Sequence, residues 1–275
     1  MGRVNEEISR RLSGDRILKN LEKINPEFSK PERILPIVTI MPFFVGGIGW
    51  FFSSEAAPNI PLYKDPLSIF CVIVMLSSCL LALISKIKRW GWHAKYFGVG
   101  ALYVGSVSLL GIVPFLCIVL YSYLPLLARL VLFLSYSSVV LWWCWRFVLF
   151  YRAITAGERW NEKIYVEDED VVYYLQKNDT WFLKNRYRFR QLPFTPFFVI
   201  MASLGFSLFP FGKTISSSIG MPVIYLFMTV SFFPFVLMLL GLMTRGYLIY
   251  YFYPRKIRES TGKSVYIDMV TRTLH

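Results

Sequence analysis

Six apolar runs, each near the length of a membrane-crossing helix, constrain this chain more than any other feature. A helix needs about 20 apolar residues, at a rise of about 1.5 Å each, to cross the hydrocarbon core of a bilayer. Hydrophobic residues make up 55% of the chain, against about 45 to 50% in a soluble domain. The sequence therefore predicts an all-α, polytopic transmembrane helical bundle. The six expected spans are Ile34 to Phe52, Leu67 to Ile84, Phe97 to Leu120, Leu124 to Trp145, Pro193 to Phe211, and Gly220 to Met243.

The distribution of lysine and arginine predicts which way the spans run. Basic residues crowd the segment before the first run, the loops after the second and fourth runs, and the segment after the sixth, whereas the outer loops hold only Lys64 and Lys213. Cytoplasmic loops retain positive charge. We therefore expect six spans in three hairpins, with both termini cytoplasmic, in a cell inner (plasma) membrane of bacterial type. Outer turns are expected at Ser53 to Pro66, Tyr121 to Tyr123, and Gly212 to Ile219.

This topology divides the chain into five parts. Because the chain before Ile34 is polar and charged, no cleaved signal peptide is expected. The long inner loop, of about forty residues, is too short to hold a core of its own. The expected parts are a basic amphipathic cytoplasmic segment (1–33), two transmembrane hairpins (34–151), a cytoplasmic loop (152–192), a third hairpin (193–243) and a cytoplasmic tail (244–275).

A net charge of +13 does not indicate nucleic acid, because that partner requires cations on one continuous water-facing surface. Here the cations lie between apolar runs. They favour membrane lipids of the anionic inner leaflet, a protein partner, or self-association. The residues expected at such contacts are Lys184, Arg186, Arg188, Arg190, Arg255, Lys256 and Arg258.

The placement of acids and histidines argues against several chemistries. Only Glu55 and Asp65 lie outside the expected cytoplasmic segments, and no acid lies within a span. Proton- and cation-coupled transporters use intramembrane carboxylates or histidines, so this class is disfavoured. His93 and His275 are not placed for a dyad or metal triad, and the four cysteines lie in apolar runs. No catalytic residue, metal site or cofactor is therefore expected.

The run Glu167 to Asp170 suggests one sharper hypothesis, a divalent-cation site in an enzyme acting on lipid headgroups. Adjacent acids on a strand point to opposite faces, and no second carboxylate cluster completes a cage. A solvated or partner-docking patch is the preferred interpretation.

Two arginines and a stripe of small residues lie within or beside the expected spans. Arg129 and Arg146 lie near opposite ends of the fourth run, so both can extend to the headgroups, and an anion path is the alternative. Small residues allow close helix approach. The stripe expected to pack against another helix is Gly98, Ala101, Gly105 and Ser108.

A short pattern also recurs at the inner ends of two spans. Arg146, Leu149 and Tyr151 repeat the spacing of Arg245, Leu248 and Tyr250. Because inner helix ends favour arginine and tyrosine, we interpret this echo as convergence in preference to a duplicated hairpin.

These observations favour a non-catalytic subunit of a multi-protein or homo-oligomeric membrane assembly, which docks partners through basic cytoplasmic segments. Two alternatives stay open. One is a small homo-oligomeric, anion-favouring channel or membrane-permeabilising effector, suggested by hydroxyl-rich spans and the two arginines. The other is a lipid-processing enzyme at the inner interface.

Overall fold

The computed structural model of the chain describes residues 31–61, 63–87, 93–155, 164–167, 171–181, 183–184 and 189–268. The expected amphipathic segment before Pro31 lies outside these residues. The fold is mostly helical. Within these residues, four helices are long and apolar enough to cross a membrane, namely Phe97–Tyr121, Leu126–Thr155, Thr195–Ile219 and Val223–Thr261.

The helices follow the apolar runs but extend beyond them. The first two runs form α2 (Pro31–Ala56) and α3 (Pro66–Ile87). The third forms α4 (His93–Gly105), a 3-10 turn (Ser106–Ser108) and α5 (Leu109–Tyr121) in one rod, and the fourth forms α6 (Leu126–Thr155). The last two form α9 (Thr195–Ser207), a 3-10 turn (Phe209–Phe211) and α10 (Gly212–Ile219), then α11 (Val223–Tyr247), a π-helical segment η4 (Leu248–Phe252) and α12 (Tyr253–Thr261).

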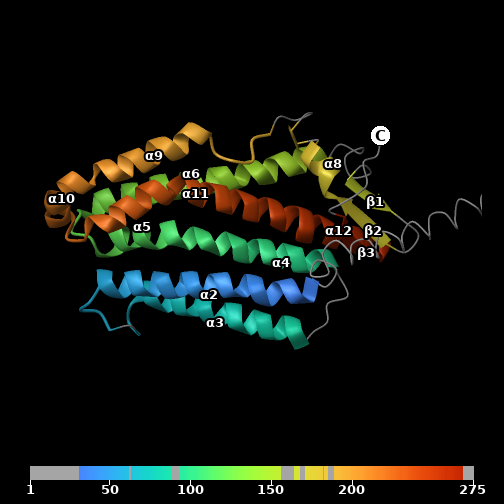
Figure 1. The fold of residues 1–275 in the computed structure, drawn as a ribbon, viewed down its shortest axis with the longest axis horizontal. Coiled ribbons are helices and arrows are strands. Elements are labelled where there is room, and N and C mark those ends of the chain that lie inside the picture. The colour runs from blue at the N-terminus through green and yellow to red at the C-terminus, as the bar shows by residue number, and fades with distance from the viewer. Residues whose placement is uncertain are drawn as a thin grey trace, which may run out of the picture.

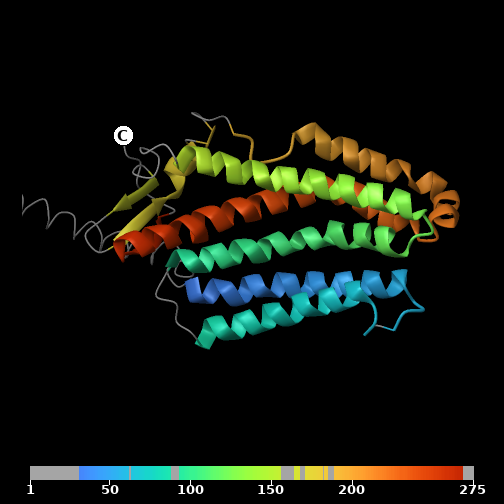
Figure 2. The ribbon, with the colours of Figure 1, turned by 180° about the vertical axis from the view of Figure 1, so that it is seen from behind.

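Helix α11 is the centre of the bundle. It contacts α4, α5, α6 and α9, while α2 packs against α3, α4 and α5. The α2–α3 pair therefore forms one edge of the bundle and α9 the opposite edge (Figure 1). Figure 2 shows α6 on the face that α11 partly hides in Figure 1.

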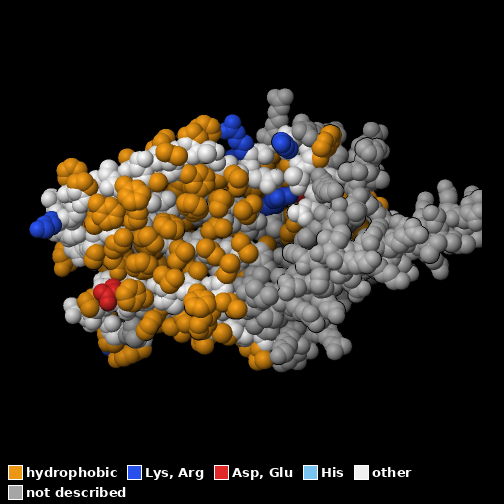
Figure 3. Space-filling model, in the orientation of Figure 1, with side chains coloured by type: hydrophobic (Ala, Val, Ile, Leu, Met, Phe, Trp, Pro, Cys, Tyr) orange, Lys and Arg blue, Asp and Glu red, His pale blue; other side chains and the backbone are white. Residues whose placement is uncertain are grey.

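Most of the bundle surface is apolar. The most apolar windows of the α6 span and of the α9–α10 span are only 6% buried. Hydrophobic side chains cover the bundle over most of its length on the face shown in Figure 3. Such a surface is costly in water but suits lipid, which explains why these helices need no polar outer face.

A small sheet closes one end of the bundle (Figure 1). Strands β1 (Tyr165–Glu167), β2 (Val171–Leu175) and β3 (Ser264–Asp268) have the order β1-β2-β3, with β1 antiparallel and β3 parallel to β2. The short helix α8 (Gln176–Trp181) follows β2. We call β1, β2, β3 and α8 the platform, and the opposite end of the bundle, with the connections 57–65, 122–125 and 220–222, the turn end.

The platform is an addition to the all-α expectation. Alternate residues of β2 and β3 are buried, Val172 and Tyr174 on one strand and Val265 and Ile267 on the other. The platform thereby unites the loop after α6 with the segment after α12, which the sequence analysis treated as separate parts.

Several expected boundaries differ from the structure. Residues Gly212 to Ile219 are not a turn, because they form α10, and the chain reverses at Gly220 with φ +69°. A side chain at Gly220 would also collide with the Tyr123 ring, so glycine suits this turn on both counts. Pro193 and Phe194, which begin the fifth expected run, precede α9, and the helix that contains most of the sixth run continues to Thr261.

Candidate functional site

A buried ion pair joins the platform to the central helix. Arg245, near the end of α11, donates from Nη2 to Oδ2 of Asp179 on α8 at 2.7 Å. The Asp179 side chain is fully buried and the Arg245 side chain is 15% exposed. A buried pair of this kind is held in place by the further hydrogen bonds around it, because desolvation offsets much of its Coulomb attraction.

Three further side chains complete this charge cluster. Arg245 donates from Nε to the Tyr151 hydroxyl at 3.0 Å and from Nη1 to Gln191 Oε1 at 2.9 Å. The Tyr174 hydroxyl donates to Asp179 Oδ2 at 2.8 Å. One guanidinium thus joins α6, α8, α11 and the segment that leads to α9.

The charge cluster keeps Tyr174, its tyrosine on β2, in the neutral form. Burial, and next the negative charge of Asp179, raise the pKa of Tyr174 well above its usual value. Tyr174 therefore remains a hydrogen-bond donor. The other carboxylate oxygen of Asp179, Oδ1, is buried and has no protein partner in the described part of the chain, so the cluster holds one unsatisfied acceptor.

The π-helical segment η4 lies directly after the charge cluster. Within it, the Ile249 carbonyl accepts a hydrogen bond from the Tyr165 hydroxyl of β1 at 2.7 Å. The Tyr250 ring lies 6.1 Å from the Phe97 ring and 5.5 Å from the Tyr174 ring. Short π segments occur often at functional sites. Here the segment presents a carbonyl and an aromatic ring to the platform.

The expected small-residue stripe lies against α11 and η4. A Cβ atom at Gly98 would lie 2.8 Å from the Tyr251 Cβ, and one at Gly105 would lie 2.4 Å from the Met243 Sδ. Ala101 similarly faces Gly246. The absence of side chains therefore sets how closely α4 approaches the central helix.

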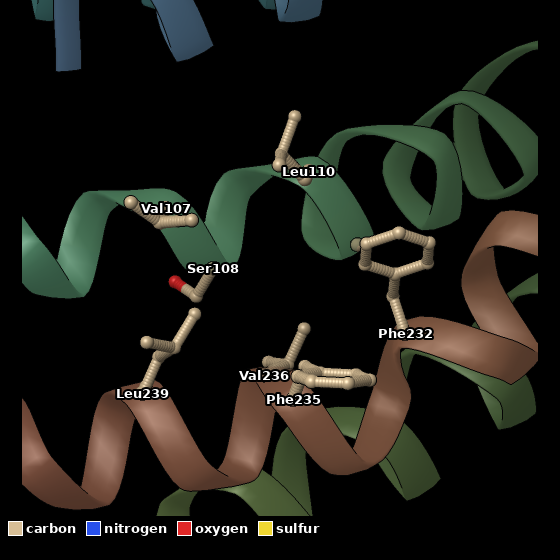
Figure 4. A pocket seen from close by; sticks show the side chains of 8 residues that line it. Val107, Ser108, Leu110, Phe232, Phe235, Val236 and Leu239 are labelled. Carbon is tan, nitrogen blue, oxygen red and sulfur yellow. The ribbon is translucent and has the colours of Figure 1, made fainter. Parts of the chain in front are cut away.

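Ser108, the fourth member of the stripe, lines a shallow groove between the α4–α5 rod and α11 (Figure 4). Its neighbours in the groove are apolar. Groove residues include Val107, Leu110, Phe232, Phe235, Val236 and Leu239.

The two singled-out arginines of α6 lie in separate places. Arg129 donates to the carbonyls of Val119 and Leu120 at 3.5 and 3.2 Å, where the end of α5 leaves acceptors without helical partners. Arg146 donates from Nη2 to the Arg190 carbonyl at 2.7 Å. The structure therefore does not bring Arg129 and Arg146 together.

The expected contact residues divide between the platform side and α12. Lys184 is exposed, while Arg186 and Arg188 lie outside the described residues. On α12, Arg255 pairs with Glu259 at 2.8 Å, Lys256 lies 4.7 Å from the Phe252 ring centroid, and Arg258 is exposed. These cations lie on the exposed face of one short helix beside the platform.

The acidic run is placed only in part. Glu167, at the end of β1, pairs with Lys263 at 2.8 Å just before β3. Asp168 to Asp170 lie outside the described residues. Among those residues that the structure describes, no group of three potential ligands could hold a metal ion.

A second buried acid lies at the turn end and was not singled out as a site from the sequence. Asp65 precedes α3 and accepts backbone hydrogen bonds from Leu67 and Ser68 at 3.2 and 2.9 Å. It also accepts from the hydroxyls of Ser53, at 2.5 Å, and Tyr121. We call Asp65, Ser53, Tyr121 and the two amides the cap cluster.

The charge of Asp65 is favoured by these donors. Burial acts to raise its pKa, but the hydrogen bonds from Ser53, Ser68 and Tyr121 together outweigh burial and hold the pKa below its usual 3.8. The cap cluster therefore contains a carboxylate that ties α2, α3 and α5 together at the turn end.

Comparison of the chain with protein families, with curated proteins and with solved structures finds no match.

Proposed function

We propose that this chain is an integral subunit of a multi-protein or homo-oligomeric assembly in a bacterial-type inner membrane, and that its platform is the docking element. In this proposal all six apolar helices span the bilayer in three hairpins, and the platform and both termini lie in the cytoplasm. The observation that carries the proposal is the ion pair between Arg245 and Asp179.

This ion pair supports a docking role because it gives the platform a fixed position. A loop of about forty residues has too little core to stay folded alone. Here the buried residues Tyr151, Ile249 and Tyr253 of the helices pack in one cluster with Tyr174 and Val265 of the sheet. The platform is thereby built as a rigid surface on the end of the bundle, as a binding partner requires.

The buried charges also support a structural role over a catalytic one. Asp179 is used to position α8, and Asp65 to cap α3. Arg129 and Arg146, which motivated the channel alternative, each donate to backbone carbonyls. The channel and the lipid-processing enzyme remain predictions from the sequence, without added support from these contacts.

Reporter fusions test the proposed orientation. Fusions within the segment around Lys184 should report a cytoplasmic location, and fusions near Lys64 a location across the membrane. An external Lys184 segment would overturn the orientation and the docking role of the platform.

Purification tests the assembly itself. The tagged full-length chain, extracted in mild detergent, should migrate as an oligomer or with stoichiometric partners. Trp181, with 56% of its surface exposed at the end of α8, belongs to the residue types that dominate interfaces. The variant Trp181→Ala should weaken the association, whereas Trp142→Ala on α6 is the matched control for loss of an exposed tryptophan. Recovery of the wild-type chain solely as a monomer would contradict the proposal.

A further inference from the structure

Two arginine side chains lie together where α6 meets the segment that leads to α9. Arg146 donates from one guanidinium nitrogen, at 2.7 Å, to the backbone carbonyl of Arg190. Its guanidinium carbon lies 4.6 Å from the Trp143 ring centroid and 4.8 Å from that of Phe189. The Arg190 guanidinium lies 5.4 Å from the Phe194 ring centroid. Aromatic rings therefore hold both cations in position.

The Arg146 guanidinium thus lies at the backbone of Arg190, the residue that carries the second cation. Within the described part of the chain, ion pairs engage Asp179, Glu259 and Glu167 with other cations, and none engages Arg146 or Arg190. A guanidinium has five N–H donors, and the one hydrogen bond of Arg146 within the described residues leaves others available. This pair of cations is thus complementary to an anion with several acceptor oxygens.

The surroundings favour an anion that carries hydrocarbon. On α6, Trp142, Trp145 and Leu149 expose about half of their surface or more, and Leu192 and Phe194 do so before α9. Trp142 and Leu149 lie about one helical turn from Arg146, and the Phe194 ring lies beside Arg190, so apolar surface adjoins both cations. A free phosphate would leave this surface uncovered, whereas a phospholipid would cover it with acyl chains.

We propose that Arg146 and Arg190 form a binding site for the phosphate of an anionic phospholipid, whose acyl chains lie along the exposed apolar faces of α6 and α9. The site rests on the proposed position of this end of α6 at the inner leaflet, and it does not require the platform to bind a protein. A guanidinium pair suits this ligand because each can offer two parallel N–H donors to phosphate oxygens.

Native mass spectrometry of the full-length chain in detergent tests the site with defined lipids. Phosphatidylglycerol should bind about 30-fold more tightly than phosphatidylcholine of the same chain length, since two basic side chains near a membrane surface each add about a fivefold preference. The double variant Arg146→Gln/Arg190→Gln should bind both lipids equally. The matched control Lys64→Gln/Lys213→Gln, at two exposed basic residues of the turn end, should keep the wild-type preference.

The single variant Arg190→Gln provides a test if the double variant does not fold, because the Arg190 side chain is exposed. It should lower the preference by about fivefold. Glycerol phosphate and inorganic phosphate, tested as competitors, should displace phosphatidylglycerol weakly. Competition as strong as that of the lipid would overturn the lipid assignment in favour of a free anion.

Three other results would also overturn the proposal. These are equal binding of the two lipids by the wild-type chain, an unchanged preference in the double variant, and an equal loss of preference in the Lys64→Gln/Lys213→Gln control. Because the measurement uses the isolated chain, its failure is distinguishable from failure of the proposed assembly, which is measured by oligomeric state.

Discussion

Asp65 and Asp179 are both buried carboxylates that tie distant parts of the chain together, but the turn end and the platform end satisfy them differently. Asp65 accepts from two hydroxyls and two backbone amides, which are all neutral. Asp179 relies on the cation of Arg245 and on tyrosine hydroxyls. The stabilisation of the Asp65 carboxylate is divided among several neutral donors. The stabilisation of the Asp179 carboxylate depends mainly on one cation. The platform end should therefore be the more sensitive to a single substitution.

The largest expected effect is that of Arg245→Met. The variant leaves Asp179 buried without its cation, which costs about 3 to 5 kcal/mol of stability. Thermal or denaturant unfolding in detergent measures the loss of stability, and proteolysis of the platform should become faster in the same variant.

The double variant Arg245→Met/Asp179→Leu is the control for this result. It removes both charges, so it should recover a large part of the stability lost in the single variant. A double variant as unstable as the sum of the two single variants would show that the ion pair does not couple the platform to α11.

The second effect concerns close packing at the platform end. Gly98→Ala places a methyl group 2.8 Å from the Tyr251 Cβ and 3.2 Å from the Tyr250 backbone, so it should destabilise the fold by about 1 to 3 kcal/mol. Gly100→Ala meets no atom within 4 Å and should stabilise the helix by about 0.5 to 1 kcal/mol. If unfolding measurements showed that both variants change stability in the same direction, this account of the α4 contact would be contradicted.

The third effect is pH-dependent and belongs to the turn end. Because the folded-state pKa of Asp65 lies below 3.8, its contribution is complete above the unfolded-state value of about 3.9 and is lost as pH falls through the folded-state value. Asp65→Asn should lower stability at pH 7 by about 1 to 2 kcal/mol. It should also flatten the decline below about pH 4. Melting curves between pH 2.5 and pH 7 check this, and an unchanged acid slope in Asp65→Asn would assign the decline to other groups.

The smallest effect is expected from the loss of one tyrosine hydroxyl, compared between the turn end and the platform end. Tyr121→Phe removes one of the several neutral donors to Asp65 and should cost about 1 kcal/mol. Tyr174→Phe removes a donor from Asp179, whose Oδ1 has no partner among the described residues, and should cost about 2 kcal/mol. Equal losses in the two variants would remove the contrast between the cap cluster and the charge cluster.

The helices could be predicted from the sequence because length and hydrophobicity are local properties. Each expected run lies almost entirely within a helix, although Pro193, Phe194 and the turn at Gly220 fall outside α9 and α11. The sheet could not be predicted in the same way, because β2 and β3 pair across two apolar helices. Val171 to Leu175 does carry the β-branched and aromatic residues typical of a strand, but this signal does not name its partner.

The cap cluster could be predicted in part from the sequence, whereas the charge cluster could not. Asp65 before Pro66 and an apolar run is a helix-start signal, so its capping role was open to prediction, although its bonds to Ser53 and Tyr121 were not. Arg245 was counted among the basic tail residues and Asp179 was not singled out. Their pairing depends on how the loop folds back on α11, which residue spacing does not determine.

The parallel pairing of β2 with β3 also has a consequence for the order of biosynthesis. Strand β2 is translated before α9 and α11, while β3 follows α12. The edge of β2 that pairs with β3 therefore has no native partner until the last helix has been made. This pairing joins two strands that are far apart in the sequence, so it forms late in folding. The sheet can therefore be completed only after these helices have been made.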